Sequence, residues 1–178
     1  MSVLSVTPGK LEGVQLFCPR VFEDDRGFFT ETYQVDKYRE AGIDRTFVQD
    51  NFSLSRKNVL RGLHFQRNYP QGKLVYVVQG EIWDVAVDIR TGSSTYGQWE
   101  GHTLSAENHH QLYIPEGFAH GFVVLSETAS VIYKCTDVYR PEDDAGLIWN
   151  DPDLAIAWPI NEPILSAKDA VLPSLRAV

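Results

Sequence analysis

Short runs of apolar and β-branched residues, separated by turns, dominate the chain. KLVYVVQGEIWDVAVDIR (73–90) has the pattern of two strands that meet at Gln79-Gly80, which is typical of a hairpin. LYIPEGFAHGFVVL (112–125) and ASVIYKCTDVY (129–139) have the same character. Many short strands separated by turns predict an all-β fold, either a sandwich or a small barrel.

Helical patterns are few and short. A helix is predicted over residues 35–41, where Asp36 lies near the start and Gly42 is placed to end it. The C-terminal tail is expected to contain a second short helix near residues 166–172. No repeat and no linker composition interrupts the chain, so we expect a single domain over residues 1–178.

The predicted hairpin gathers charged side chains on an apolar face. With a two-residue turn at Gln79-Gly80, Val75 pairs with Asp84, and strand alternation places Lys73 on the same face. That face comprises Lys73, Val75, Val77, Ile82, Asp84 and Ala86. Lys73 then lies diagonal to Asp84, within reach of a long side chain. The two residues form either a surface ion pair on a solvated strand or a barrel-mouth lysine held by an acidic neighbour.

The stretch LRGLHFQ (60–66) carries a basic and a titratable side chain on a strand-like pattern. Strict alternation places Arg61 and His64 on opposite faces of the strand. They share a pocket only if Gly62 marks a bulge or kink, which is a common use of glycine within a strand. The alternative is a structural histidine beside an exposed arginine.

Residues 114–124, IPEGFAHGFVV, match the P-x-G-x-x-H element of cupin barrels, with His120 as its histidine. Cupins that bind a metal also need an H-x-H followed by a glutamate, whereas this chain offers only His64 followed by Phe65-Gln66. The other histidines lack a spacing typical of metal ligands; they are His102, His109 and His110. We therefore predict no catalytic metal and no cofactor, which metal analysis of the purified protein would test.

Several polar residues remain on the apolar strands of the expected barrel: His64, Lys73, His120 and Tyr133. Tyr133 can also be a core tyrosine whose hydroxyl is hydrogen-bonded. Asp169, in the segment SAKD, fits a capping box, in which a serine and an acidic residue satisfy the first backbone N–H groups of a helix. Asp169 therefore either caps a helix or takes part in catalysis.

Composition and charge narrow the classes of partner. The net charge of −8 argues against nucleic acid as the main partner. Charges beyond roughly 8 Å are screened, so a local basic pocket for an anionic ligand remains compatible with that charge. No apolar run is long enough for a membrane span. The start lacks a signal-peptide pattern, and Cys18 and Cys135 lie far apart, so we expect reduced thiols in a cytoplasmic protein.

Several motifs occur together in one order along the chain. RGLHFQ, Lys73, GEIWDVAVDIR, PEGFAHGF, the tyrosine of VIYKC and WNDPDLAIAWP resemble the dTDP-4-dehydrorhamnose 3,5-epimerase family, as do DDRGFFTETY and QDNFSLS. The resemblance spans residues 14–173. It implies an all-β, cupin-type double-stranded β-helix (a jelly-roll barrel) with short peripheral helices, a homodimer, and no metal.

The resemblance also implies a reaction and a set of roles. The family inverts the two carbons that flank the ketone of dTDP-4-keto-6-deoxyglucose, in the pathway to dTDP-L-rhamnose. By similarity, His64 is the base and Asp169 is its carboxylate partner. Lys73 would face the developing enolate oxygen, and Tyr133 would deliver a proton from the opposite side.

Further residues match ligand-binding positions of the family: Arg26, Glu31, Gln49, Asn51, Arg61, His120 and Lys168. We add Asp84 and Phe28 as candidate substrate contacts. Either Phe28 or Phe29 is expected to present a ring to the thymine from its own or a partner subunit; the alternative is that both are core residues. The family often reads P-E-H-E-x-G where this chain has PEDDAG, so Asp144 replaces a glutamate that is one methylene longer, and it is retained as a candidate contact.

These residue types suit the chemistry. Removing a proton beside a ketone needs a base with a pKa near the working pH, and an ordinary histidine has a pKa of about 6.5. A fixed cation at the ketone oxygen typically contributes about 3–4 kcal/mol to the transition state. Reprotonation from the far face needs a second acid, and a tyrosine is protonated at neutral pH. Arg26 and Arg61 are expected to bind the diphosphate through planar, paired donors.

Three other functions stay open on the sequence alone. One is an epimerase that inverts a single carbon of a related dTDP-4-keto-6-deoxysugar. Another is a ketoisomerase of the same fold, and the third is a binding module for sugar nucleotides without catalytic activity. NMR of the product distinguishes the first two from double epimerisation. A binding module would show no turnover, so a His64→Ala substitution would cause no loss of activity.

Overall fold

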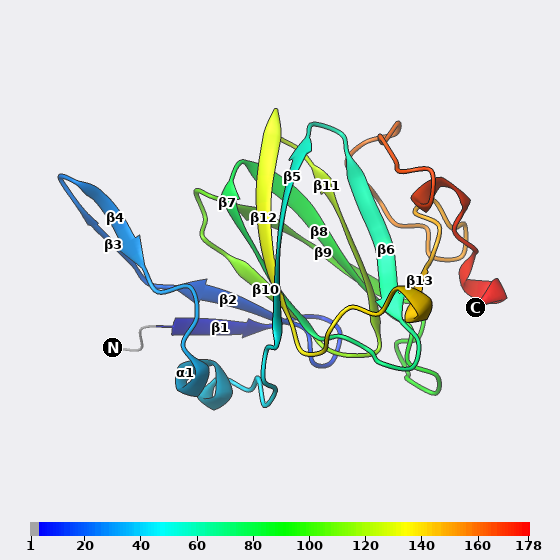
Figure 1. Cartoon of the computed structure of the whole chain (residues 1–178), viewed down its shortest axis with the longest axis horizontal. Coiled ribbons are helices and arrows are strands. Elements are labelled where there is room, and N and C mark those ends of the chain that lie inside the picture. Colours follow the sequence, from blue (N-terminus) through cyan, green and yellow to red (C-terminus); the bar gives the residue numbers. More distant parts are fainter. Residues whose placement is uncertain (1–3) are drawn as a thin grey trace.

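Two antiparallel sheets lie face to face in this computed structural model, which describes residues 4–178 (Figure 1). One sheet contains, in spatial order, β1 (Leu4–Pro8), β2 (Gln15–Pro19), β10 (Gln111–Ile114), β7 (Lys73–Gln79), β12 (Thr128–Cys135) and β5 (Gln49–Arg56). The other contains β13 (Asp144–Gly146), β6 (Leu60–Gln66), β11 (Phe118–Val124), β8 (Glu81–Asp88) and β9 (Trp99–Ser105). The predicted all-β, jelly-roll architecture is confirmed.

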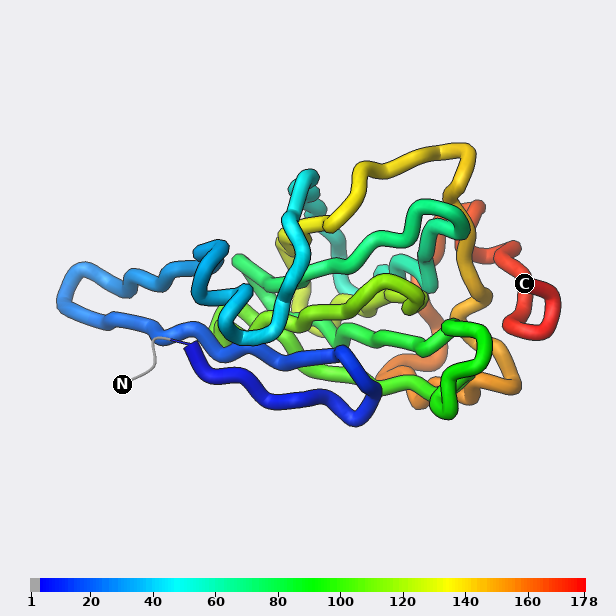
Figure 2. The backbone as a smooth tube through the Cα atoms, turned by 90° about the horizontal axis from the view of Figure 1, so that it is seen from below, coloured from blue at the N-terminus to red at the C-terminus, as the bar shows by residue number. Residues whose placement is uncertain are grey.

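A hairpin of two short strands, β3 (Val21–Asp24) and β4 (Gly27–Thr30), forms a separate ribbon. It projects from one end of the molecule, and the C-terminal segment lies at the opposite end (Figures 1 and 2). The hairpin is therefore not part of the wall of its own barrel.

The predicted N-terminal helix is present as α1 (Val35–Glu40). Its N-terminus is capped by the side chain of Gln34, which accepts a hydrogen bond of 2.7 Å from the backbone N–H of Lys37. The predicted Gly42 follows the last turn with a φ of +108°, a conformation that glycine adopts without strain. The helix expected near residues 166–172 is a single 3₁₀ turn, Asp169–Val171, and two further 3₁₀ turns lie at Pro141–Asp143 and Leu175–Ala177.

The hairpin predicted over residues 73–90 is wrong. β7 pairs with β10 and β12, whereas β8 pairs with β9 and β11, so the chain crosses from one sheet to the other at Gly80. Gly80 has a φ of +76°, which the tight connection requires. A short turn between two apolar runs suits both kinds of connection, so the sequence pattern does not distinguish them.

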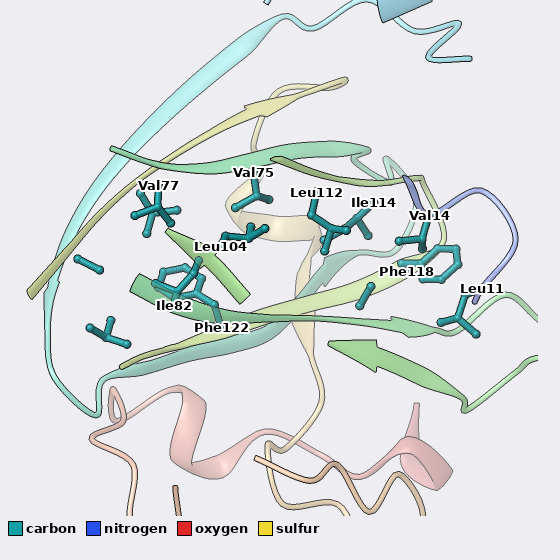
Figure 3. Close-up of a cluster of buried hydrophobic side chains, with 14 residues drawn as sticks. Leu11, Val14, Val75, Val77, Ile82, Leu104, Leu112, Ile114, Phe118 and Phe122 are labelled. Carbon is teal, nitrogen blue, oxygen red and sulfur yellow. The ribbon is translucent and has the colours of Figure 1, made fainter. Parts of the chain in front are cut away.

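The predicted faces of these two strands are nevertheless correct. Their inward residues belong to the main core between the sheets; they are Val75, Val77, Ile82 and Ala86. Figure 3 shows this cluster, in which Leu104, Leu112 and Phe122 pack from neighbouring strands. Lys73 and Asp84 share these inward faces, but they belong to different sheets and are not diagonal neighbours in one ladder.

The opposite face of the five-stranded sheet is covered by the C-terminal segment. Leu147, Leu154 and Leu175 from this segment pack against Leu63 and Val85 of the sheet. Most residues of β8 are buried, and β6 has buried residues on both faces, so both strands are packed between the main core and the C-terminal segment. The segment also carries Asp169 back to β6, which positions the site described next.

Candidate active site

Two adjoining pockets share three side chains: His64, Lys73 and Tyr133. The larger pocket has a volume of about 300 Å³ and the smaller pocket about 130 Å³. Beyond the shared residues, the larger pocket is lined by Gln49, Asn51, Phe65, Gln66, Gln71, Tyr139, Asp144 and Lys168. The smaller pocket is lined by Ser53, Arg61, His120 and Phe122. Most of the predicted site residues therefore converge on one place.

His64 and Asp169 form a hydrogen-bonded pair at the junction of the pockets, although they are 105 residues apart in sequence. His64 Nε2 donates to Asp169 Oδ1 at 2.7 Å, because an ionised carboxylate only accepts. Burial raises the pKa of Asp169, but the hydrogen bond and charge of His64, together with hydrogen bonds from Gly62 and Ser166, outweigh burial, and the pKa lies below its ordinary value. The pair leaves His64 Nδ1 as the nitrogen that is able to accept a proton.

Asp169 also makes part of the predicted capping contact. Its backbone N–H donates to Ser166 Oγ at 3.0 Å. Its carboxylate, however, contacts His64 and the backbone N–H of Gly62, the latter at 3.5 Å. Capping and orientation of the histidine thus use different atoms of one residue, so the two interpretations of Asp169 are compatible.

Gly62 brings Arg61 and His64 into the same pocket. The pairing of β6 with β11 shifts register between His120 and Phe122, opposite this glycine, and Gly62 has a φ of +124°. A Cβ atom at Gly62 would lie 2.6 Å from the Cα of Gly121. Only glycine fits this backbone and this close approach. The bend predicted at Gly62 is therefore present.

Lys73 lies at the start of β7 with a relative exposure of 9%. Burial lowers the pKa of Lys73, while Cys135, Asp84 and Asp144 act in the opposite direction. No ion pair holds its ammonium group within the described residues. A buried cation without a paired carboxylate is well placed to stabilise a negative charge that develops on a ligand.

Tyr133 lies on β12, beside Lys73 and across the pockets from β6. Burial raises the pKa of Tyr133, so its hydroxyl is protonated at neutral pH. On β5, Asn51 is its ladder partner and donates to Cys135 Sγ at 3.5 Å, while Gln49 Nε2 donates to Asn51 Oδ1 at 3.1 Å. These contacts fix an amide-rich wall of the larger pocket.

Asp144 and Lys168 form an ion pair at the edge of the larger pocket. The hydroxyl of Tyr139 donates to the same carboxylate oxygen that Lys168 contacts, at 2.9 Å from Asp144 Oδ2. The shorter carboxylate that distinguishes this chain from the family pattern is thus engaged by two pocket residues. A nearly half-exposed lysine and an aromatic ring at this edge suit a ligand that is both charged and planar.

His120 and Asp84 form a second buried pair, in which His120 lines the smaller pocket and Asp84 does not. Both oxygens of Asp84 lie within 3.0 Å of His120 Nε2, and Asp84 has no exposed surface. Burial lowers the pKa of His120, although Asp84 partly counteracts this, so the ring is neutral with its proton on Nε2. Asp84 lines neither pocket, and the structure therefore places it behind His120, where the prediction had a direct substrate contact.

Arg61 reaches the smaller pocket from β6. Its Nε donates to Ser55 Oγ at 2.9 Å, which orients the guanidinium group. Ser53, two residues earlier on the same face of β5, lines the same pocket. Among the described residues, its Oγ is the buried side-chain oxygen or nitrogen atom that has no hydrogen-bond partner.

Besides Asp84, three predicted ligand contacts lie outside both pockets of their own chain. Arg26, at the tip of the projecting hairpin, bonds Asp24 and is strongly exposed. Phe28 has a relative exposure of 60% and packs against the ring of His109. Glu31 forms an ion pair of 2.7 Å with Lys37. Within one chain, the structure does not bring these residues to the other site residues.

Several lining residues were missed from the sequence. Ser53 lines the smaller pocket, and Ser55 orients Arg61 without lining a pocket. Both continue the alternation of Gln49 and Asn51 along QDNFSLSR, so extending that polar face would have found them. Other missed lining residues carry no local signal because loops bring them to the pockets; they include Gln71 and Tyr139.

Within residues 4–178 no group of three or more histidine, cysteine or acidic side chains is arranged to hold a metal ion. The structure also has no helix, over the same residues, that is long and apolar enough to cross a membrane. Our expectation of a reaction without metal or cofactor stays a prediction.

The jelly-roll barrel and the convergence of a histidine–carboxylate pair, a buried lysine and a tyrosine define a cupin-type enzyme of the nucleotide-sugar epimerase class. A family model described as dTDP-4-dehydrorhamnose 3,5-epimerase matches residues 8–177. The chain belongs to this family.

Individual relatives agree with this assignment. A dTDP-4-dehydrorhamnose 3,5-epimerase of Neisseria gonorrhoeae is 59% identical over 89% of this chain, although the match covers 49% of that relative, so the chain spans about half its length. The crystal structure of a 3,5-epimerase of Legionella pneumophila, in complex with dTDP-4-keto-L-rhamnose, has a TM-score of 0.96 and 50% identity, covering 98% of this chain and 94% of that one. A dTDP-4-dehydrorhamnose 3-epimerase of Streptomyces niveus is 40% identical over 93% of this chain and 81% of its own length.

Proposed function

We propose that the chain inverts C3 and C5 of dTDP-4-keto-6-deoxyglucose, as a dTDP-4-dehydrorhamnose 3,5-epimerase acting in the synthesis of dTDP-L-rhamnose. The observation that carries this proposal is the junction of the two pockets. There a base with a fixed tautomer, a buried cation and a protonated phenol face the same space. These are the three groups that epimerisation beside a ketone requires.

The roles of the residues follow from their chemistry. His64 Nδ1 takes the proton from the carbon next to the ketone, and the electron pair of that C–H bond moves to the ketone oxygen. Lys73 stabilises the resulting enolate oxygen, and Asp169 stabilises the imidazolium. Tyr133, on the strand across the pocket, then gives its proton to the opposite face of the carbon. As the ketone re-forms, His64 releases its proton to solvent and Tyr133 regains one from solvent. The same steps at the second carbon then complete the reaction.

The two pockets suit different parts of this substrate. The sugar is the terminal group of a nucleotide sugar, and its reacting carbons must lie at His64 and Lys73. The larger pocket has room for the nucleoside diphosphate, with Lys168 for phosphate oxygens and Tyr139 for a ring. The smaller pocket then receives the part of the sugar that faces away from the phosphate.

The projecting hairpin supports a homodimer with composite sites. Arg26 and Phe28 are predicted ligand contacts, yet they lie on a ribbon outside the pockets of their own chain. Phe22 and Phe29 on the same ribbon are also exposed, as expected for a surface that another chain covers. The hairpin would place these contacts in the pocket of a second copy.

Subunit complementation tests this arrangement. Arg26→Ala and His64→Ala homodimers should each be nearly inactive. A heterodimer of the two has one site with both His64 and an intact incoming Arg26. Random 1:1 mixing makes half of the dimers hybrid, so about a quarter of the wild-type activity should return. Absence of recovery, when mass spectrometry shows that hybrids have formed, would mean that Arg26 acts within its own chain or not at all.

The reaction itself is tested by incubation with dTDP-4-keto-6-deoxyglucose in D₂O, followed by NMR. We expect deuterium at both C3 and C5 and conversion to the L-sugar, both abolished by His64→Ala. Label and inversion at C3 alone would favour the 3-epimerase activity named for the relative of Streptomyces niveus. A shifted keto group would instead identify an isomerase.

We also propose a cytoplasmic location, which the free thiols of Cys18 and Cys135 support.

A further inference from the structure

Two residues that line the smaller pocket each have a side-chain nitrogen or oxygen atom without a hydrogen-bond partner in the described chain. One is Nδ1 of His120, because the hydrogen bonds of this ring are made by Nε2 with Asp84. The other is Oγ of Ser53. Both residues line the same cavity of about 130 Å³. Buried polar groups normally have partners, so the buried Oγ of Ser53, together with the unbonded ring nitrogen of His120 in the same small pocket, indicates that a ligand completes them.

The free nitrogen of His120 has a defined polarity. Asp84 is fully buried and its carboxylate accepts from Nε2 through both oxygens. Nε2 therefore carries the proton and Nδ1 presents a lone pair. An acceptor of this kind binds a hydroxyl or an N–H group. It repels the ketone oxygen and the phosphate oxygens of a nucleotide sugar, which are themselves acceptors.

Ser53 complements this acceptor. Its Oγ is covered in the structure although the residue lines the pocket, so recognition of a ligand requires the hydroxyl to turn to another staggered rotamer when the ligand binds. A serine hydroxyl both donates and accepts. Together, Ser53 and His120 match a ligand group that donates one hydrogen bond and accepts another, which is a hydroxyl group.

We propose that Ser53 and His120 recognise one ring hydroxyl of the hexose, and that the smaller pocket thereby selects sugars that carry it, with Asp84 as a positioning residue. This inference rests on the proposed function, since it takes the sugar as the ligand of this pocket. Lys73 is assigned to the oxygen at C4, so the neighbouring hydroxyl at C3 and the next one at C2 are the two candidates.

The test compares three substrates by their deuterium exchange at C5, a step that all three undergo. They are dTDP-4-keto-6-deoxyglucose and its 2-deoxy and 3-deoxy analogues. The wild-type enzyme should lose at least about a hundredfold in kcat/KM with the analogue that lacks the recognised hydroxyl, because two pocket groups stay unsatisfied. Ser53→Ala should lose about tenfold with the parent sugar and much less with that analogue. The analogue that shows this loss identifies whether the recognised hydroxyl is the one at C2 or the one at C3.

A matched control is Ser130→Ala. Ser130 is a buried serine of the same sheet that donates to Gln79 and lines neither pocket, so its substitution should leave all three rates unchanged. The melting temperature of Ser53→Ala should equal or exceed that of the wild type, because the change removes a buried hydroxyl without a partner. An equal loss of rate on all three substrates, or no loss with the parent, would overturn the proposal.

His120 provides an independent arm. His120→Asn keeps a side-chain acceptor near Nδ1, whereas His120→Ala has none, so the asparagine variant should be faster with the parent sugar and no faster with the deoxy analogue. Equal rates for both variants with the parent would contradict an acceptor role. If the wild type showed no exchange, the proposed function would fail. In that case, calorimetry would compare the affinities of the His64→Ala variant and the His64→Ala, Ser53→Ala double variant for the parent nucleotide sugar. Equal affinities would overturn the inference.

Discussion

Replacing Asp169 by asparagine separates its two structural roles. The amide has nearly the shape of the carboxylate, and the capping contact uses the backbone N–H of residue 169, which the substitution keeps. What changes is the charge that faces His64 Nε2 at 2.7 Å. We expect folding to persist and turnover to fall.

The size of the effect follows from the geometry. Asp169 has a side-chain exposure of 6%, so solvent screens its interaction with His64 weakly. A hydrogen bond to a charged group contributes about 1.5–3 kcal/mol, which is roughly 10- to 150-fold in rate. The amide N–H₂ group can also turn toward Nε2 and place the histidine proton on Nδ1, the atom that must act as base. Together these effects predict a loss of about 10²- to 10⁴-fold in kcat.

Ser166→Ala is the matched control. It removes the cap of Asp169 but leaves the carboxylate and the His64 contact. Initial rates by NMR should fall strongly for Asp169→Asn and by less than about threefold for Ser166→Ala. The melting temperature at neutral pH should fall for both variants, through the lost cap in Ser166→Ala and through the lost carboxylate interactions in Asp169→Asn. Similar losses of rate in both variants would refute our reasoning, because they would mean that Asp169 acts through the local fold.

The same substitution should alter the pH dependence of stability. The pKa of Asp169 is lower in the folded chain than its ordinary value of 3.8, so the ionised residue stabilises the fold above that value. This contribution disappears as the pH falls through the lowered pKa. Asp169→Asn should therefore flatten the acid side of a plot of unfolding free energy against pH. An unchanged slope below pH 4 would show that the carboxylate is not stabilised by its partners.

Three further substitutions test the remaining parts of the site. Lys73→Met should lower kcat about 10²- to 10³-fold yet raise the melting temperature at neutral pH, because the lowered pKa of Lys73 means that its charged form is less favourable in the folded chain than in the unfolded chain. Tyr133→Phe should keep exchange of deuterium but suppress inversion, which NMR of recovered starting material in D₂O detects. Gly62→Ala should lower the melting temperature by about 5–15 °C, as measured by differential scanning fluorimetry, since a Cβ there meets backbone atoms at a positive φ.

Local patterns predicted the strands and their faces well. Alternation assigned Val75 and Ile82 to the interior, and the conflict between alternation and a shared pocket pointed to the bend at Gly62. Both inferences depend on side-chain periodicity, which is a property of a single strand. The pairing of strands is not such a property, and this is why the hairpin over residues 73–90 was wrong.

Contacts between distant parts of the chain were beyond the sequence pattern. Nothing in the SAKD segment indicates that Asp169 meets a histidine 105 residues away, and only the resemblance to a family suggested it. Asp84 was a candidate substrate contact, and it lies fully buried without lining either pocket, because an inward residue of a barrel can be a lining residue or a covered one. The depth of each residue depends on how the two sheets pack together.

The placement of charge at the site explains how a chain of net charge −8 can attract an anionic substrate. The carboxylates near the pockets are paired: Asp84 with His120, Asp169 with His64, and Asp144 with Lys168. Over residues 4–178, Lys73 and Arg61 have no such acidic partner, so the junction of the two pockets has an excess of positive charge. Because the acidic residues elsewhere lie mostly on the surface, salt screens their repulsion more strongly than it screens this buried attraction.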